Sequence, residues 1–292
     1  MQSNVAVIDV GSNSVRLMLV ANGKVLYKRT VITRLGEGLA STGRLQAEPI
    51  RRTVCQIAAF CSQAKTDGAD KIYAYATAAV RSAVNRQEFL SSVQSACGLS
   101  VEVLSGDEEA LIGIAGALGK KDGGVLDIGG ASTELILQKH GEPVYRKSVD
   151  VGVVRLYDIC GRDREKLESF CKGKALEFSA ALPNMQGLTL CGIGGTATTL
   201  AAVLLGQKSY DGNAVTGKSF SVAEIRRLTG RLFQMSEQEI ASIPCVEQAR
   251  AQVLTGGAAW LNVLTEYLGI SSLTVSDCDN LEGYAKSRGL LE

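Results

Sequence analysis

One sequence pattern occurs twice in this chain and restricts its fold more than any other feature. Residues 7–19 read VIDVGSNSVRLML, and residues 125–137 read VLDIGGASTELIL. In register the two segments share an Asp, a Gly, a Ser and two Leu, but Arg16 in the first is replaced by Glu134 in the second. Each copy begins a unit of three strands, a helix, a strand and a helix. This repetition predicts two similar α/β domains whose equivalent turns face each other across a cleft.

The spacing of apolar residues predicts the elements of each unit. In the first unit we expect strands at 4–10, 13–21, 24–34, 71–77 and 100–105, and helices at 47–65, 85–97 and 107–118. In the second we expect strands at 124–129, 132–138, 143–149, 188–193 and 272–277, and helices at 162–181, 195–205, 221–234, 236–242, 245–268 and from 280. The join falls in GKKDGG, which predicts domains at 1–120 and 121–292, with the final helix packing back on the first domain. A single doubly wound sheet is the alternative.

The composition excludes several classes of function. Thirty-one Lys and Arg balance 30 Asp and Glu, so nothing in the overall charge favours nucleic acid or an anionic membrane. No apolar run of about 18 residues and no leader pattern is present, and the eight Cys lack metal-ligand spacing, which predicts a cytoplasmic protein with reduced thiols. The one histidine, His140, lies in a turn-like stretch, so a serine–histidine–aspartate triad is disfavoured and proton transfer falls to carboxylates.

The two repeated turns suit a phosphate group. In each copy an Asp ends a strand, and the small residues that follow form a tight hairpin that leaves backbone N–H groups uncovered. A pair of ordinary β-hairpins, with Asp and Gly as turn formers, is the alternative. The candidate phosphate contacts in these turns are Gly11, Ser12, Asn13, Ser14, Gly129, Gly130, Ala131 and Ser132.

Seven motifs together resemble one protein family. They are VIDVGSNSVRLMLV, TRLGEGL, ATAAVR, VLSGDEEALIGIAGAL, LDIGGASTEL, GIGGTATTLAA and VSD, in this order across nearly the whole chain. The chain resembles the exopolyphosphatase and guanosine pentaphosphate phosphohydrolase family, which belongs to the superfamily of actin, Hsp70 and the sugar kinases. The resemblance implies two actin-like (ribonuclease H-like) domains with a phosphate-binding cleft between them. It also implies hydrolytic removal of the terminal phosphate from a phosphoanhydride chain, with inorganic polyphosphate or guanosine pentaphosphate as substrate.

This reaction needs positive charge beside the phosphate and a group that orients water. Arg16 and Arg81 are the candidate guanidinium contacts, with a surface role as the alternative for Arg81. The resemblance implies that Glu109, the second Glu of SGDEEA, is catalytic, although a carboxylate at a helix start also stabilises the helix. Glu134 is the other candidate for holding the water, and the choice between the two stays open. Asp9, Asp127 and Glu134 are the candidate ligands of Mg²⁺ or another divalent cation, with turn formation as the alternative for each Asp.

The stretch GIGGTATT allows two interpretations. Its glycines fit G-x-G-x-x-A between a strand and a helix, which is typical of a dinucleotide site, but QKSYDGNAVTG follows where that fold needs a second parallel strand. The resemblance instead implies that Gly194, Gly195 and Thr196 guide a polyphosphate tail or a guanosine end. A sensor without turnover and a kinase of the same superfamily are the remaining alternatives.

The sequence departs from the family at three positions. Ala131 replaces a third glycine of the second hairpin. In SDCDNLEG, Cys278 replaces a glycine and Leu281 replaces an arginine, so any contact of that arginine is absent. Many relatives continue into a helical domain that this sequence lacks, which leaves the preferred chain length open; a homodimer could build a longer groove.

Overall fold

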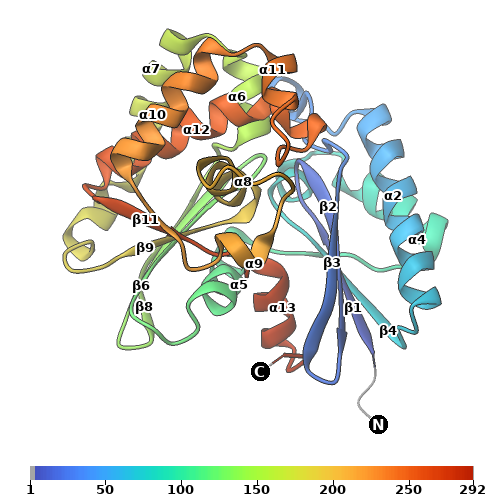
Figure 1. The fold of residues 1–292 in the computed structure, drawn as a ribbon. Helices are drawn as coiled ribbons and strands as arrows, with labels where there is room; N and C mark the ends of the chain where they lie inside the picture. The colour runs from blue at the N-terminus through green and yellow to red at the C-terminus, as the bar shows by residue number, and fades with distance from the viewer. Residues whose placement is uncertain (1–3, 292) are drawn as a thin grey trace.

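The computed structural model describes residues 4–291 and contains two β-sheets, one from each half of the chain (Figure 1). The first sheet has the strand order β3-β2-β1-β4-β5, with β1 (Val5–Val10), β2 (Ser14–Ala21), β3 (Lys24–Ile32), β4 (Lys71–Ala76) and β5 (Glu102–Val103). The second has the order β10-β11-β9-β6-β7-β8, with β6 (Gly123–Ile128), β7 (Thr133–Lys139), β8 (Glu142–Val149), β9 (Leu190–Ile193), β10 (Ser219–Ser221) and β11 (Ser272–Val275).

The two sheets repeat one arrangement. In each, three successive strands pair antiparallel, and a later strand (β4 or β9) pairs parallel with the first of them. Asp9 lies opposite Arg16 in the first sheet, and Asp127 lies opposite Glu134 in the second. The repeated sequence pattern therefore folds into equivalent hairpins, and the expected α/β fold with two actin-like sheets is confirmed.

The helices cover the sheets and fill the space between them (Figure 1). Those of the first half are α1 (Leu39–Thr42), α2 (Ala47–Thr66), α3 (Ala78–Ser82), α4 (Arg86–Cys97) and α5 (Gly106–Ala117). Those of the second half are α6 (Val153–Cys160), α7 (Arg164–Ala175), η1 (Leu176–Asn184), α8 (Gly194–Leu204), α9 (Gly212–Val215), α10 (Val222–Gln234), α11 (Glu237–Ala241), η2 (Gln248–Arg250), α12 (Ala251–Tyr267) and α13 (Asn280–Ser287). None of the helices in residues 4–291 combines the length and the apolar character that spanning a bilayer requires.

Several local predictions differ from the structure. The helix expected at 245–268 begins only at Ala251, after η2, and the short helices α1, α3 and α9 were not predicted. The helix expected at 162–181 ends at Ala175 and continues as a 3₁₀ helix that contains Pro183, which has no N–H to donate. The sequence pattern missed α6, which has no side-chain cap and only two turns. It also missed β10, whose three residues are too few to show alternation.

Helices α5 and α13 lie between the two sheets. Ile112 of α5 packs with Val7 of β1 and Leu281 of α13. On another side of the same helix, Ala110 and Ile114 pack against Val125 and its neighbours in the second sheet. The backbones of α5 and α13 approach closely, because a methyl group at Gly116 or Gly283 would collide with the carbonyl of Asp279 or Ile112, respectively. The first turn of α5 is thereby held between both halves.

Candidate functional site

The two repeated hairpins have the same backbone geometry and touch each other. In each, the glycine N–H donates to the serine carbonyl at 3.0 Å, from Gly11 to Ser14 and from Gly129 to Ser132. A methyl group at Gly130 would lie 2.6 Å from Cβ of Ser12 and 2.8 Å from the backbone nitrogen of Asn13. Only glycine fits at position 130, because the opposite hairpin occupies the space of a side chain.

Ala131, the small departure from the family pattern, fits without distortion. Its side chain is buried, and its carbonyl accepts a hydrogen bond from Nε of Arg155 at 3.1 Å. The methyl group of Ala131 does not line the cavity, so the substitution leaves the backbone of the hairpin accessible at Gly129 and Gly130.

A cavity of about 400 Å³ lies against both hairpins. Its lining combines residues of both sheets with the glycine turn at the start of α8 and the loop before α13. Of the residues predicted from the sequence it brings together Asp9, Gly11, Ser12, Asn13, Ser14, Arg16, Glu109, Asp127, Gly129, Gly130, Ser132, Gly194, Gly195 and Thr196. Three predicted residues, Arg81, Ala131 and Glu134, lie behind this lining.

Glu109 faces the cavity from the first turn of α5. The hydroxyl of Ser105 caps this helix by accepting a hydrogen bond from the backbone N–H of Glu108, and the carboxylate of Glu108 accepts one from the backbone N–H of Ser105. The cap therefore holds the side chain of Glu108, whereas that of Glu109 takes no part in it. Glu109 is buried, and its Oε2 accepts a hydrogen bond from Nη1 of Arg81 at 2.8 Å. Burial raises the pKa of Glu109 above its ordinary value, against the opposing attraction of Arg81.

Glu134 is buried on β7 beside Glu109 and Asp127. Its Oε1 accepts a hydrogen bond from Oγ of Ser148 at 2.6 Å, whereas its Oε2 has no partner within residues 4–291. Burial, and then repulsion by Glu109 and Asp127, raise the pKa of Glu134 well above its ordinary value. This environment favours the protonated form of the carboxyl group.

Arg16 lines the cavity, but two carboxylates already hold its guanidinium. Its Nε donates to Oδ2 of Asp9 at 2.9 Å, and its two terminal nitrogens form ion pairs with Asp9 and Asp279. Burial opposes the ionisation of Asp279, yet Arg16 and Lys28 keep its pKa below the ordinary value. A phosphate that binds Arg16 must therefore compete with Asp279 or share the guanidinium with it.

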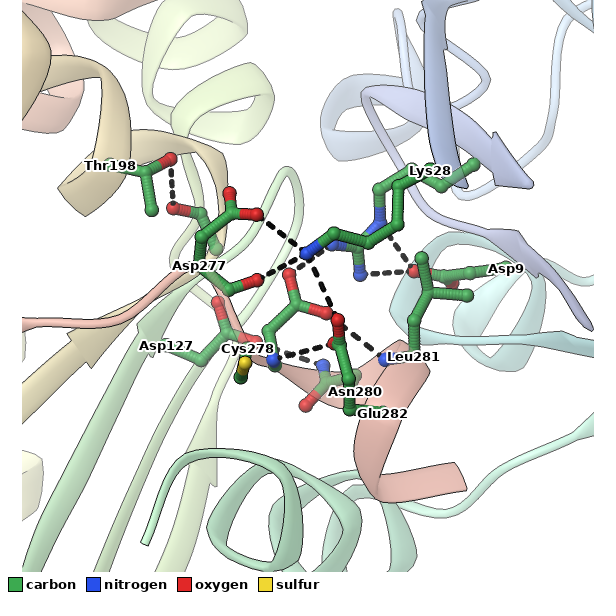
Figure 2. A network of polar contacts seen from close by, with 12 residues as sticks. Asp9, Lys28, Asp127, Thr198, Asp277, Cys278, Asn280, Leu281 and Glu282 are labelled. Atoms are coloured by element: carbon green, nitrogen blue, oxygen red, sulfur yellow. Dashed lines mark hydrogen bonds and ion pairs between the residues drawn. The ribbon is translucent and has the colours of Figure 1, made fainter. Parts of the chain in front are cut away.

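The predictions from sequence did not include the polar network around the loop before α13 (Figure 2). Nζ of Lys28, on β3, lies 2.6 Å from Oδ2 of Asp277 and 3.0 Å from Oε1 of Glu282. Asn280, at the start of α13, donates from Nδ2 to Oδ2 of Asp127 at 2.9 Å. Three acidic residues within the short segment SDCDNLEG, directly after a strand, were the signal that could have revealed this network.

Arg250 is a second residue that the sequence pattern missed. It lines the cavity next to Gly195, where a methyl group would overlap its guanidinium. Burial lowers the pKa of Arg250, with a partial opposing effect from Glu247, and no ion pair in the described part of the chain includes this arginine. Arg250 therefore provides a cation at the glycine turn of α8 that forms no ion pair with a carboxylate of residues 4–291. The sequence signal was weak, since a lone Arg before an apolar helix is a common helix flank.

The carboxylates around the cavity fit a divalent cation that substrate helps to hold. Within residues 4–291 no three His, Cys, Asp or Glu side chains form a ready metal-binding group. However, Oδ1 of Asp9 is buried and has no partner among residues 4–291, and burial together with Asp279 and Glu109 raises the pKa of Asp127 to about 7. Mg²⁺ commonly binds through one or two carboxylates plus substrate phosphates, which suits this arrangement.

Fold and cavity define an actin-like α/β protein in which paired glycine hairpins and buried carboxylates face one site. Comparison with known proteins gives the particular family. The chain belongs to the Ppx/GppA phosphatase family, whose model matches residues 5–288.

Three similar proteins illustrate this membership. Exopolyphosphatase 2 of Mycobacterium tuberculosis is 32% identical over an alignment of 314 positions, which covers 98% of each protein. The guanosine-5'-triphosphate,3'-diphosphate pyrophosphatase of Aeromonas hydrophila is 31% identical over 93% of this chain and 56% of its own length. The solved structure of the Aquifex aeolicus PPX-GPPA enzyme is 30% identical, with a TM-score of 0.77 over 98% of this chain and 100% of that one. The recognition of the family from sequence motifs is confirmed, and the chain is a phosphoanhydride hydrolase by family.

Proposed function

We propose that this protein removes the terminal phosphate of inorganic polyphosphate by hydrolysis. The observation that carries the proposal is the position of Glu109, a buried carboxylate that faces the same cavity as both glycine hairpins. A relative of matching length, 32% identical, has the name exopolyphosphatase. The hairpins supply N–H and hydroxyl donors to phosphate oxygens, and Arg250 supplies a cation for the rest of the polyanion.

In the proposed reaction Glu109 is the general base. A water molecule attacks the terminal phosphorus and its proton passes to Glu109, while the bond from phosphorus to the bridging oxygen breaks and the shortened chain keeps that oxygen. Arg81 orients the carboxylate and favours its ionised form. Glu134 suits this role less well, because it lies behind the lining of the cavity, and burial together with two neighbouring carboxylates raises its pKa well above the ordinary value.

Asp127 and Asp9 are the proposed contacts of Mg²⁺, with Glu134 behind them. When bound, the cation neutralises phosphate charge in a site where carboxylates otherwise repel the substrate. The residues of the chain then position the substrate: Ser12 and Asn13 from one side, and Gly129 and Gly130 from the other.

Guanosine pentaphosphate, cleaved at its 5′ phosphate, is the second candidate substrate. Tyr210 lines the cavity and is 44% exposed, so its ring is accessible to a base. Glu247 also lines the cavity and offers acceptor oxygens near Arg250. A relative named guanosine-5'-triphosphate,3'-diphosphate pyrophosphatase is 31% identical, which supports this alternative.

Phosphate release with Mg²⁺ from polyphosphate and from guanosine pentaphosphate, measured side by side as kcat/KM, tests the proposal. We expect both reactions to be measurable and polyphosphate to be preferred. A clear preference for guanosine pentaphosphate would replace the first substrate with the second. Tight binding of either anion without any release would indicate a sensor, and transfer to an alcohol or carboxylate acceptor would indicate a kinase; both would contradict the proposal.

A further inference from the structure

A second cavity, of about 350 Å³, lies between the two halves of the chain on another side of the proposed catalytic carboxylates. Arg81 of α3 and Gly106 of α5 line it from the first half, and Ser148 of β8 and Lys174 of α7 line it from the second. Its lining shares no residue with that of the main cavity.

One ion pair connects the linings of the two cavities and forms a polar wall between them. Glu109 lines the main cavity, and its ion-pair partner Arg81, 2.8 Å away, lines the second one. The Arg81 side chain is 24% exposed and that of Glu109 only 7%, so the pair joins an enclosed site to an open one. Close by, Ser148 lines the second cavity and donates to the buried Glu134 at 2.6 Å. Opening a path here requires the Arg81 side chain to leave Glu109 and the carbonyl of Leu104, and a change of rotamer can do this without backbone movement.

The charges along the second cavity suit the passage of an anion better than its retention. Arg81 and Lys174 are positive, but Asp150 and Glu177 also line the cavity, and Glu177 holds Nζ of Lys174 at 2.7 Å. Two cations and two carboxylates leave no net charge there. A phosphate that enters would meet cations, yet the cavity would not bind it tightly.

We propose that the second cavity is the exit for the orthophosphate released by hydrolysis. The inference rests on the proposed function. After cleavage the shortened polyphosphate still occupies the main cavity and blocks the way back for the product. Release past Arg81 lets the product leave while the polymer stays bound, so that its next phosphate can advance to Glu109. Product release limits turnover in many enzymes, which makes such an exit visible in kinetics.

Substituting Lys174→Trp tests this exit, because an indole at position 174 fills the cavity without touching the lining of the main one. Lys172→Trp, at an exposed position of the same helix, is the matched control. Lys174→Ala removes the contact with Glu177 and leaves the cavity open. For each variant, rapid quench measures cleavage in the first turnover on polyphosphate with Mg²⁺, and a fluorescent phosphate-binding protein measures free orthophosphate.

We expect Lys174→Trp to cleave at the wild-type rate, within about twofold, in the first turnover but to release free phosphate at least about tenfold more slowly. The products of Lys174→Trp should show that polyphosphate dissociates from the enzyme after each cleavage. Lys172→Trp and Lys174→Ala should behave as wild type. Equal release by Lys174→Trp and Lys172→Trp would overturn the exit while leaving the proposed function intact. Slow release by Lys174→Ala would also overturn it, because charge rather than space would be the cause. Absence of cleavage in the wild type would overturn the proposed function, and the exit with it.

Discussion

Nη1 of Arg81 lies 2.8 Å from Oε2 of Glu109, and this ion pair connects α3 with the first turn of α5. The arginine also donates to the carbonyl of Leu104 at 2.9 Å, which fixes its position next to the carboxylate. Burial alone would favour the neutral form of Glu109, so the arginine is the main group that keeps the carboxylate available as a base.

Loss of this ion pair should shift the pH dependence of the reaction. In Arg81→Met the pKa of Glu109 loses its largest lowering influence and rises further, so the acidic limb of kcat should move to higher pH. At pH 7 we expect a loss of roughly tenfold to a hundredfold, which diminishes as the pH is raised. Arg86→Met, at an exposed position of α4, is the control. A uniform loss at every pH would show that Arg81 acts only by binding phosphate.

The contact between the hairpins predicts a sharp difference between neighbouring substitutions. Gly130→Ala places a methyl group 2.6 Å from Cβ of Ser12, so the hairpins must separate and activity should fall at least about a hundredfold. The cost in stability should be about 1–3 kcal/mol. Ala131→Gly, one residue further, should keep activity within about threefold. Equal activity of the two variants in steady-state assays would contradict the closed arrangement of the hairpins.

Asp127 predicts an unusual pH dependence of stability in the metal-free protein. Its pKa of about 7 in the folded state exceeds the ordinary 3.8, so the folded protein holds a proton that the unfolded chain has released between these values. Stability from this group therefore falls as pH rises from about 4 to about 7. In EDTA, Asp127→Asn should remove this decline. Above pH 7, its free energy of unfolding should exceed that of the wild type by on the order of 4 kcal/mol.

Denaturant unfolding from pH 4 to pH 8 measures this difference. Asp107→Asn, at an exposed position, should follow the wild-type curve throughout. At pH 8, addition of Mg²⁺ should raise the free energy of unfolding of the wild-type protein but have little effect on that of Asp127→Asn. A wild-type stability that rises between pH 4 and pH 7 relative to Asp127→Asn would contradict the assigned pKa direction.

Arg250 should contribute to substrate binding more than to the chemical step. Its guanidinium lies at the glycine turn of α8 without a carboxylate partner in residues 4–291, so Arg250→Ala should raise KM for polyphosphate at least about tenfold and change kcat little. The salt dependence of kcat/KM should become shallower, because one phosphate contact is lost. Arg226→Ala, which removes a surface ion pair with Glu266, serves as control. An unchanged KM would exclude Arg250 from the binding site.

The repetition of one sequence pattern made the fold predictable. Asp, Gly and Ser at matched positions set two hairpins in the same conformation, and both hairpins line one cavity. The role of Arg81, at the end of ATAAVR, was less predictable: it belongs to a short helix, and its partner Glu109 is 28 positions away, so only the tertiary fold brings them together. The same reason explains why Asp279 and Arg250 escaped notice, since their roles depend on contacts with residues far away in the chain.

The most direct test of the account compares Glu109→Gln with Glu108→Gln in single-turnover cleavage of polyphosphate with Mg²⁺. Glu108 binds the helix cap, and glutamine can fill that place, so Glu108→Gln should cleave at nearly the wild-type rate. Glu109→Gln should still bind polyphosphate but cleave it at least about a thousandfold more slowly, because an amide at this position cannot take the proton of the attacking water. Cleavage by Glu109→Gln at the rate of Glu108→Gln would contradict the assignment of Glu109 as the base.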